Sequence, residues 1–194
     1  MSAQTDGSSE VAGTGSVQVR FVTGPSMRVA LEAGLRGAEE SVRAALYCFD
    51  DSELTRILSQ KTQRGLSVQL IFDDSQIRNP SCSHQIARMI ELQEWGAELF
   101  RLRVGSGYTI LHDKLWVVDG RLVFSGSVNP TYNGLTNNEE NLLEVIEPKV
   151  ATDALAHLDS LRARAEPVTL EFLMEHAQIC ESRRRSRSTS VRRR

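Results

Sequence analysis

The first part of the chain alternates between short apolar runs and longer stretches with helical spacing. Residues 17–23 place Val17, Val19 and Phe21 at every second position, which predicts a strand with one buried face. Ser26 then precedes apolar residues that recur every three or four positions, which is typical of a capped amphipathic helix. The pattern therefore predicts that a strand and then a helix open the folded part.

The same alternation continues to residue 74. The apolar runs at 42–49 and 66–74 predict two further strands. Between them, residues 50–65 supply capping aspartates, a leucine and isoleucine stripe, and Gly65 as a helix stop. Strands that alternate with helices indicate an α/β domain, so we expect a mixed, partly parallel β-sheet flanked by helices on both faces.

The second half of the chain adds a hairpin to this alternation. Its two apolar runs meet at Asp119-Gly120, a dipeptide favoured in tight hairpin turns. The predicted elements are a helix over 85–95, strands over 97–102, 114–119, 121–126 and 141–147, and helices over 150–165 and 169–180. No internal repeat is present, so the chain holds one copy of whatever this hairpin carries.

Composition divides the chain into three segments. Residues 1–16 are small, polar and rich in glycine, which predicts a disordered N-terminal segment. The apolar patterns then assign residues 17–180 to one folded domain and residues 181–194 to a basic, disordered tail of arginine and serine. No signal peptide and no apolar run of membrane-spanning length is present, which predicts an intracellular protein, cytoplasmic or nuclear.

Charge is distributed unevenly along the chain. The last twelve residues contain seven arginines and no acidic residue, which leaves 16 basic and 25 acidic side chains in residues 1–182. The basic tail suits contacts with phosphates, and it equally suits nuclear targeting or a phosphorylatable interaction segment. Cys82 and His84 supply two ligands at most, too few for a closed tetrahedral site, so we expect no bound metal.

Polar side chains gather on the hairpin in a way that a buried strand pair does not require. His112 and Lys114 are two residues apart, so on an extended backbone they point to the same face. Ser127 and Asn129 follow the second strand, and Pro130 after them predicts a helix with Asn129 as its N-cap. A histidine, a fixed cation and hydrogen-bonding groups at a helix start are typical of a phosphate site.

This run resembles the HKD motif of the phospholipase D superfamily. Every motif position is filled, by His112, Lys114, Asp119, Gly126, Ser127 and Asn129. The likeness extends over about residues 17–163, and "NNEENLLEVIE" resembles the family segment with a glutamate that supports the catalytic histidine. The resemblance gives that role to Glu140, or to Glu139 if the register shifts by one.

The resemblance implies cleavage of a phosphodiester in two steps without a metal or other cofactor. His112 would attack phosphorus to form a phosphohistidine, while Lys114, Ser127 and Asn129 would hold the phosphoryl oxygens. A second histidine must protonate the leaving group, because imidazole near its pKa serves as nucleophile or as acid. Asp119 is expected to stabilise the turn and strands rather than touch the substrate.

The other histidines lack the motif, and we interpret them as surface or core residues: His84, His157 and His176. Two copies of the chain would then supply the two imidazoles, which predicts a homodimer with one shared site. We expect a nucleic-acid substrate, DNA or RNA, and an endonuclease activity. Two alternatives stay open at this point, a cardiolipin-type phospholipid hydrolase and a catalytically silent nucleic-acid-binding module.

Overall fold

The computed structural model describes residues 17–79, 83–105 and 109–191. Within these ranges the strands are β1 (Gln18–Thr23), β2 (Ser41–Leu46), β3 (Ser67–Asp73), β4 (Glu98–Leu102), β5 (Lys114–Val118), β6 (Leu122–Gly126), β7 (Asn141–Ile146) and β8 (Glu166–Pro167). The helices are α1 (Pro25–Gly37), α2 (Ser52–Gln63), α3 (Asp74–Ile77), α4 (Ser83–Glu94), α5 (Tyr132–Thr136), α6 (Pro148–Arg162) and α7 (Leu170–Val191).

The strands of the described ranges form a single sheet in the order β1-β7-β6-β5-β2-β3-β4-β8. Strands β2, β3 and β4 run parallel to one another, and β5, β6, β7 and β1 pair antiparallel. The predicted mixed, partly parallel sheet is therefore confirmed. Because β5 lies antiparallel to β2, the start of β5 lies beside the end of β2, at the edge where the parallel strands end.

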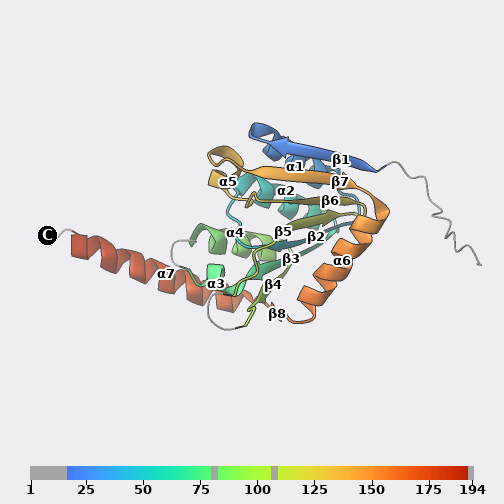
Figure 1. The fold of residues 1–194 in the computed structure, drawn as a ribbon. Helices are drawn as coiled ribbons and strands as arrows, with labels where there is room; N and C mark the ends of the chain where they lie inside the picture. Colours follow the sequence, from blue (N-terminus) through green and yellow to red (C-terminus); the bar gives the residue numbers. More distant parts are fainter. Residues whose placement is uncertain (1–16, 80–82, 106–108, 192–194) are drawn as a thin grey trace, which may run out of the picture.

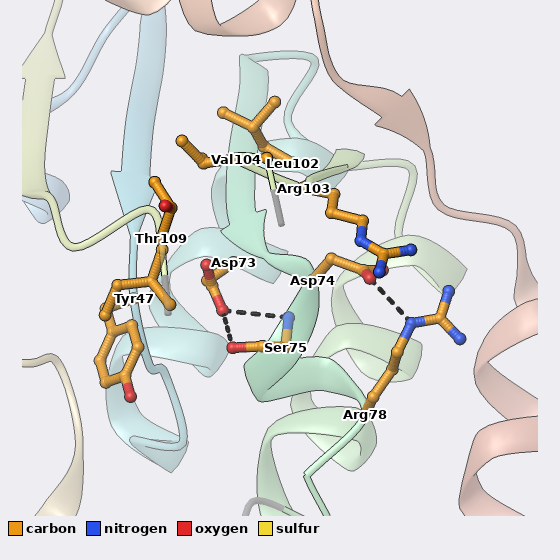
Figure 2. Close-up of a pocket in the computed structure, with 11 residues that line it drawn as sticks. Tyr47, Asp73, Asp74, Ser75, Arg78, Leu102, Arg103, Val104 and Thr109 are labelled. Carbon is orange, nitrogen blue, oxygen red and sulfur yellow. Dashed lines mark hydrogen bonds and ion pairs between the residues drawn. The ribbon is translucent and has the colours of Figure 1, made fainter. Parts of the chain in front are cut away.

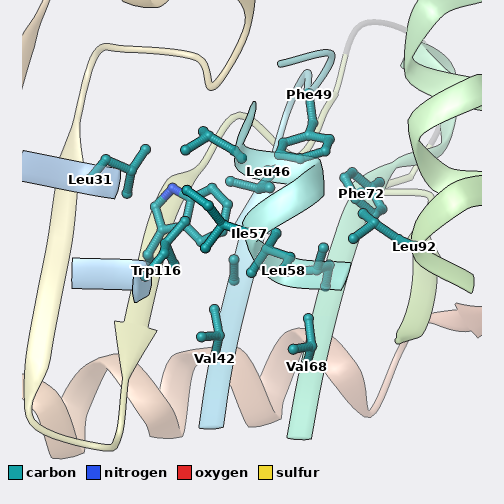
Figure 3. Packing of buried hydrophobic residues seen from close by; sticks show 14 of the residues in the cluster. Leu31, Val42, Leu46, Phe49, Ile57, Leu58, Val68, Phe72, Leu92 and Trp116 are labelled. Carbon is teal, nitrogen blue, oxygen red and sulfur yellow. The ribbon is translucent and has the colours of Figure 1, made fainter. Parts of the chain in front are cut away.

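Helices cover the sheet unequally on its two faces. The larger apolar core joins one face to α1, α2, α4 and the start of α7 through residues such as Leu31, Ile57 and Leu92 (Figure 3). On the opposite face α6 crosses the sheet and buries Ala151, Leu158 and Leu161 against a second cluster (Figure 1). The prediction of helices on both faces is confirmed, with α6 as the main cover of the second face.

The predicted hairpin is confirmed, and its turn explains the dipeptide at its tip. Both Asp119 (φ 50°) and Gly120 (φ 61°) adopt positive φ, and the Arg121 amide donates to the Val118 carbonyl at 3.1 Å. Two central residues with positive φ define a type I′ turn, whose twist matches that of paired strands. The turn fixes the register of β5 against β6.

Strand β1 forms as predicted, but the prediction of its buried face was wrong. Val17, Val19 and Phe21 are 62%, 55% and 69% exposed, whereas Val22 is buried. Val19 pairs with Val145, which packs in the cluster beneath α6, so the alternating residues lie on the α6 side. Because β1 is the edge strand and α6 does not reach over it, this apolar row stays uncovered.

Helix boundaries differ from the prediction at two places. Helix α1 begins at Pro25 with Gly24 as N-cap, and no side chain caps it, so Ser26 lies inside the first turn. Proline suits a first helical position because that amide is unpaired in any case. Near the C-terminus, Glu166 and Pro167 pair with β4 as the short edge strand β8, since proline is tolerated on an edge.

The C-terminal segment also differs from the expected disorder. Helix α7 continues through residues 181–191, because arginine and serine contain no helix-breaking group and arginine favours helix. In Figure 1 the C-terminal end of this helix extends beyond the rest of the fold. The expected disorder of residues 1–16 falls outside the described residues. None of the described helices combines the length and apolar character needed to span a bilayer.

Candidate active site

The motif residues meet where β2 ends and β5 begins. The Tyr47 amide, just after β2, donates to the Asp113 carbonyl at 3.0 Å and extends the β2–β5 pairing to the residue beside His112. On the other side of β5, β6 ends at Gly126, and the Ser127 amide donates to the Asn141 carbonyl at 3.1 Å. Backbone pairing therefore gathers both halves of the motif at one edge of the sheet.

His112 and Lys114 contact each other directly. The Lys114 Nζ lies 3.0 Å from Nδ1 and 3.1 Å from Nε2 of His112, and it donates to the His112 carbonyl at 2.8 Å. The imidazole is exposed and lies against the Tyr47 ring, with 4.7 Å between ring centroids. The ammonium and the tyrosine thus hold an accessible imidazole from two sides.

Lys114 is a charged group in a buried position. Lys114 is only 6% exposed, and its Nζ lies 5.4 Å from the centre of the Tyr47 ring. Burial lowers the pKa of Lys114, and the negative charges of Glu140 and Asp113 oppose that shift. A buried cation without a direct carboxylate contact in the described chain is well suited to receive an anionic ligand.

Ser127 and Glu140 form a second hydrogen-bonded group beside the first. The Ser127 hydroxyl donates to Glu140 and accepts from the Asn141 amide at 3.1 Å, and the Asn138 amide group also donates to Glu140. The predicted contact between Glu140 and His112 is not made within the described chain, because both carboxylate oxygens of Glu140 are directed to other donors. Gly126 permits this arrangement, since a Cβ there would lie 2.3 Å from the Asn141 carbonyl oxygen.

Asn129 lies next to these groups with one polar atom unpaired. Its Oδ1 is buried and has no hydrogen-bond partner among the described residues, a state that costs about 1–3 kcal/mol unless a ligand or water satisfies it. The prediction of Asn129 as a helix N-cap was wrong. Thr131 caps α5 by accepting from the Gly134 amide, because Pro130 lies before the helix rather than inside it.

Asp119 is at the opposite end of β5 from His112. Its carboxylate accepts from the backbone amides of Glu39, Glu40 and Ser41 at 2.8 to 3.2 Å, at the start of β2. Burial raises its pKa, but these amides and Arg121 outweigh that effect and leave the pKa below its ordinary value. Asp119 therefore joins the hairpin turn to the neighbouring strand and does not reach the His112 edge.

Sequence reasoning missed two carboxylates that contact the His112 segment. Asp73 is buried at the end of β3, and its Oδ2 accepts from the Leu111 amide at 2.8 Å, while its other oxygen caps α3. Asp113 Oδ2 lies 2.8 Å from Nε2 of His157 on α6, a hydrogen bond that becomes an ion pair when the imidazole is protonated. The position of Asp73 directly after an apolar strand was the available signal, whereas the Asp113 contact depends on the placement of α6.

A pocket of about 790 Å³ opens beside the motif (Figure 2). Tyr47 lines one side, and Arg78 and Arg103 extend along the other side in the figure. The floor includes Asp73, which places the carboxyl ends of β2 and β3 under the pocket. Clefts outside the carboxyl ends of parallel strands are common binding sites in α/β folds. In the described ranges no three potential metal ligands cluster together, and Cys82 falls outside those ranges.

Comparison with known families matches most of this fold. The family model described as "Cardiolipin synthase, PLD-like domain" matches residues 31–162, which include the hairpin and every motif position. The mitochondrial cardiolipin hydrolase of Xenopus laevis is 28% identical over 141 residues, covering 73% of this chain and 63% of that protein. Phospholipase D of Rickettsia prowazekii is 27% identical over 133 residues, covering 68% and 60%. The chain thus spans about three fifths of the length of these relatives.

Solved structures show the same architecture. The phospholipase D family member Nuc from Salmonella typhimurium superposes with a TM-score of 0.69 at 27% identity, covering 79% of this chain and 99% of Nuc. NucT from Helicobacter pylori has a TM-score of 0.70 at 22% identity, covering 79% of this chain and all of NucT, and shows likeness of fold. Because the family match spans well over half of the chain and includes the complete hairpin motif, this protein belongs to the phospholipase D superfamily.

Proposed function

We propose that the protein is a phosphodiesterase that cleaves nucleic-acid strands internally, through a phosphohistidine intermediate and without a metal. The observation that carries the proposal is the exposed His112 imidazole held by the buried Lys114 ammonium. An accessible nucleophile next to a desolvated cation suits attack on an anionic phosphorus centre. Nuc and NucT, which this chain matches over nearly their whole length, support a compact unit of this kind.

In the proposed reaction an imidazole nitrogen of His112 forms a bond to phosphorus as the bond to the leaving oxygen breaks. A second imidazole gives its proton to that oxygen, and then removes a proton from the water that cleaves the phosphorus–nitrogen bond. Lys114 and the side-chain NH₂ group of Asn129 donate to the phosphoryl oxygens, and Ser127 contributes with its hydroxyl. Positive charge placed in advance stabilises the charge that develops on these oxygens.

The second imidazole is proposed to come from another copy of the chain. Each chain has one motif, and a twofold dimer brings identical surfaces together, so two His112 side chains can share one phosphate. The exposed apolar row of Val17, Val19 and Phe21 on edge strand β1 offers a surface that a second copy of the chain can bury.

The substrate test uses the full chain in excess chelator with labelled single-stranded and double-stranded DNA, RNA, and vesicles containing cardiolipin. We expect internal cleavage of nucleic acid and none by His112→Ala, with His84→Ala on α4 as a matched control that retains activity. Mass spectrometry of acid-sensitive, alkali-stable phosphorylated protein would detect the intermediate on His112. Intact nucleic acid beside hydrolysed cardiolipin would reject the proposal.

A mixing experiment tests the shared site. Wild-type protein is unfolded and refolded with increasing fractions of His112→Ala chains at constant total concentration. If one site needs both imidazoles, activity falls as the square of the wild-type fraction. A linear fall would mean that each chain acts alone and would reject the dimeric site.

A second candidate function is hydrolysis of a cardiolipin-type phospholipid. It is favoured by the names of relatives such as the Xenopus laevis cardiolipin hydrolase, which is 28% identical to this chain. The same motif residues would act on the lipid phosphodiester, and the vesicle arm of the substrate test separates the two functions.

A further inference from the structure

A second hollow joins the pocket beside the motif. It has a volume of about 270 Å³ and shares Asp74, Arg78 and Arg103 with the larger pocket. The remaining lining residues are Arg101 of β4, Arg164 after α6 and Glu166 of β8. Together the two hollows form a continuous groove that leads from Tyr47, in contact with His112, to the β4–β8 edge of the sheet.

The carboxylates of the second hollow are already paired with two of its four arginines. Asp74 is buried, and its two oxygens accept from Arg78 at 2.8 Å and from Arg101 at 2.9 Å. Arg101 also pairs with Glu166. The Phe172 ring of α7 lies 5.3 Å from the Arg78 guanidinium carbon and 4.5 Å from that of Arg101. These contacts fix Arg78 and Arg101 as part of the groove wall.

Arg103 and Arg164 remain without a carboxylate partner among the described residues. Arg103 is exposed at the junction of the two hollows, and Arg164 donates only to the Ser160 carbonyl, at 3.1 Å. The second hollow therefore contains four guanidinium groups and two carboxylates, in a chain whose net charge is −2. The larger pocket adds one carboxylate, the buried Asp73, whose oxygens accept from the Leu111, Ser75 and Gln76 amides.

We propose that Arg103 and Arg164 bind phosphates that flank the cleaved one, so that the groove holds one nucleic-acid strand as it leaves His112. One guanidinium group can donate to two oxygens of the same phosphate, and a nucleic-acid strand carries a series of phosphates along its backbone. This inference rests on the proposed function, because it assumes a substrate with several phosphates. It assigns the strand path and makes the enzyme's affinity depend on strand length.

The test compares Arg103→Gln/Arg164→Gln with wild-type protein on single-stranded oligonucleotides of two, six and twelve nucleotides and on bis(p-nitrophenyl) phosphate. The small diester has no flanking phosphate. We expect KM for the twelve-nucleotide strand to rise about tenfold at low salt, and the slope of log KM against log salt to decrease by about 1.4 for two lost contacts. The values of kcat/KM for the small diester should agree within about twofold.

The matched control is Arg64→Gln, which removes the same charge from an exposed position just after α2, at the edge of the sheet where the parallel strands begin. Unchanged KM of the double variant for a twelve-nucleotide strand that wild-type protein cleaves would overturn the inference and leave the proposed function intact. An equal loss in Arg64→Gln would also overturn it, because the effect would then be one of total charge. Hydrolysis of the small diester with no cleavage of any oligonucleotide would instead reject the proposed function, and the strand path with it.

Discussion

The two ends of β5 carry motif residues in opposite states. At the turn end, the Asp119 carboxylate is satisfied by three backbone amides at the start of β2. At the other end, Lys114 is buried next to an exposed imidazole, and Asn129 leaves a buried oxygen unpaired. Satisfied polar groups stabilise a fold, whereas buried groups without partners cost stability and indicate a ligand. The comparison therefore separates one supporting residue from the candidate catalytic residues within a single motif.

The largest expected effect is at the unsatisfied end. His112→Ala should lower turnover by about 10⁴-fold or more, because the proposed nucleophile is lost while the surrounding contacts remain. Its melting temperature should stay close to that of wild-type protein, since the imidazole is exposed. Single-turnover cleavage and calorimetry measure the two quantities. A variant that unfolds instead of losing only chemistry would place His112 with Asp119 as a supporting residue.

Lys114 should give the site an alkaline limit below that of an ordinary lysine. Burial lowers the pKa of Lys114 from 10.5, so the ammonium loses its proton at lower pH and the rate falls there. The unfolded chain keeps this proton up to the ordinary pKa, so stability should rise with pH in the same window. A pH profile of kcat tests this, with Lys114→Arg expected to move the limit upward. An alkaline limit unchanged in Lys114→Arg would assign it to another group.

Asp119→Asn should show the reverse pattern, with stability reduced and chemistry retained. The free energy of unfolding at pH 7 should fall by about 2 kcal/mol, because the amide replaces a charged acceptor of three N–H groups. Wild-type stability from this carboxylate should be complete above about pH 4 and lost as pH falls through its lowered pKa. Turnover per folded molecule should change less than about twofold.

Urea unfolding at several pH values measures the Asp119 effect. The control is Asp153→Asn, which removes a carboxylate from the exposed Lys149–Asp153 pair on α6 and should cost under about 1 kcal/mol. A large loss of turnover by folded Asp119→Asn protein would show that the turn end also sets the geometry of the catalytic end.

His157→Gln should have the smallest effect, a reduction in kcat of less than about tenfold. The His157 imidazole pairs with Asp113, next to His112, and is half exposed, so we expect it to position the segment rather than to react. Steady-state kinetics with the matched His84→Gln variant, on α4, measure the difference. A loss as large as that of His112→Ala would make His157 the second imidazole within one chain, which would contradict the shared site.

Local patterns were enough to predict most of the fold. The alternation of apolar runs predicted the parallel strands, and Asp119-Gly120 predicted the hairpin turn, because both signals act within a few residues. The exposed face of β1 was not predictable, since alternation shows that one face is apolar and not whether another element covers it. The predictions that Ser26 and Asn129 cap helices were wrong, because a proline can lie inside a helix start or before it. Pro25 begins α1, whereas Pro130 precedes α5.

The candidate site was predictable as a set of residues and not as a set of contacts. Spacing placed His112 beside Lys114, because residues two apart share a face of an extended segment. It did not place Glu140 with Ser127, nor Asp73 under Leu111, because these contacts join different strands. The arginine groove likewise draws on β4, β8 and the helices α3 and α6, which only the tertiary fold brings together.

The length of helix α7 bears on the length of strand that the proposed path can hold. Phe172 near its start supports the arginines of the groove, and the helix continues to Val191. Nineteen residues of helix extend about 28 Å, and consecutive nucleotides of one strand in a duplex rise about 3.4 Å. On the proposed strand path, a strand of fewer than about eight nucleotides at that spacing is too short to reach from the groove to the end of α7.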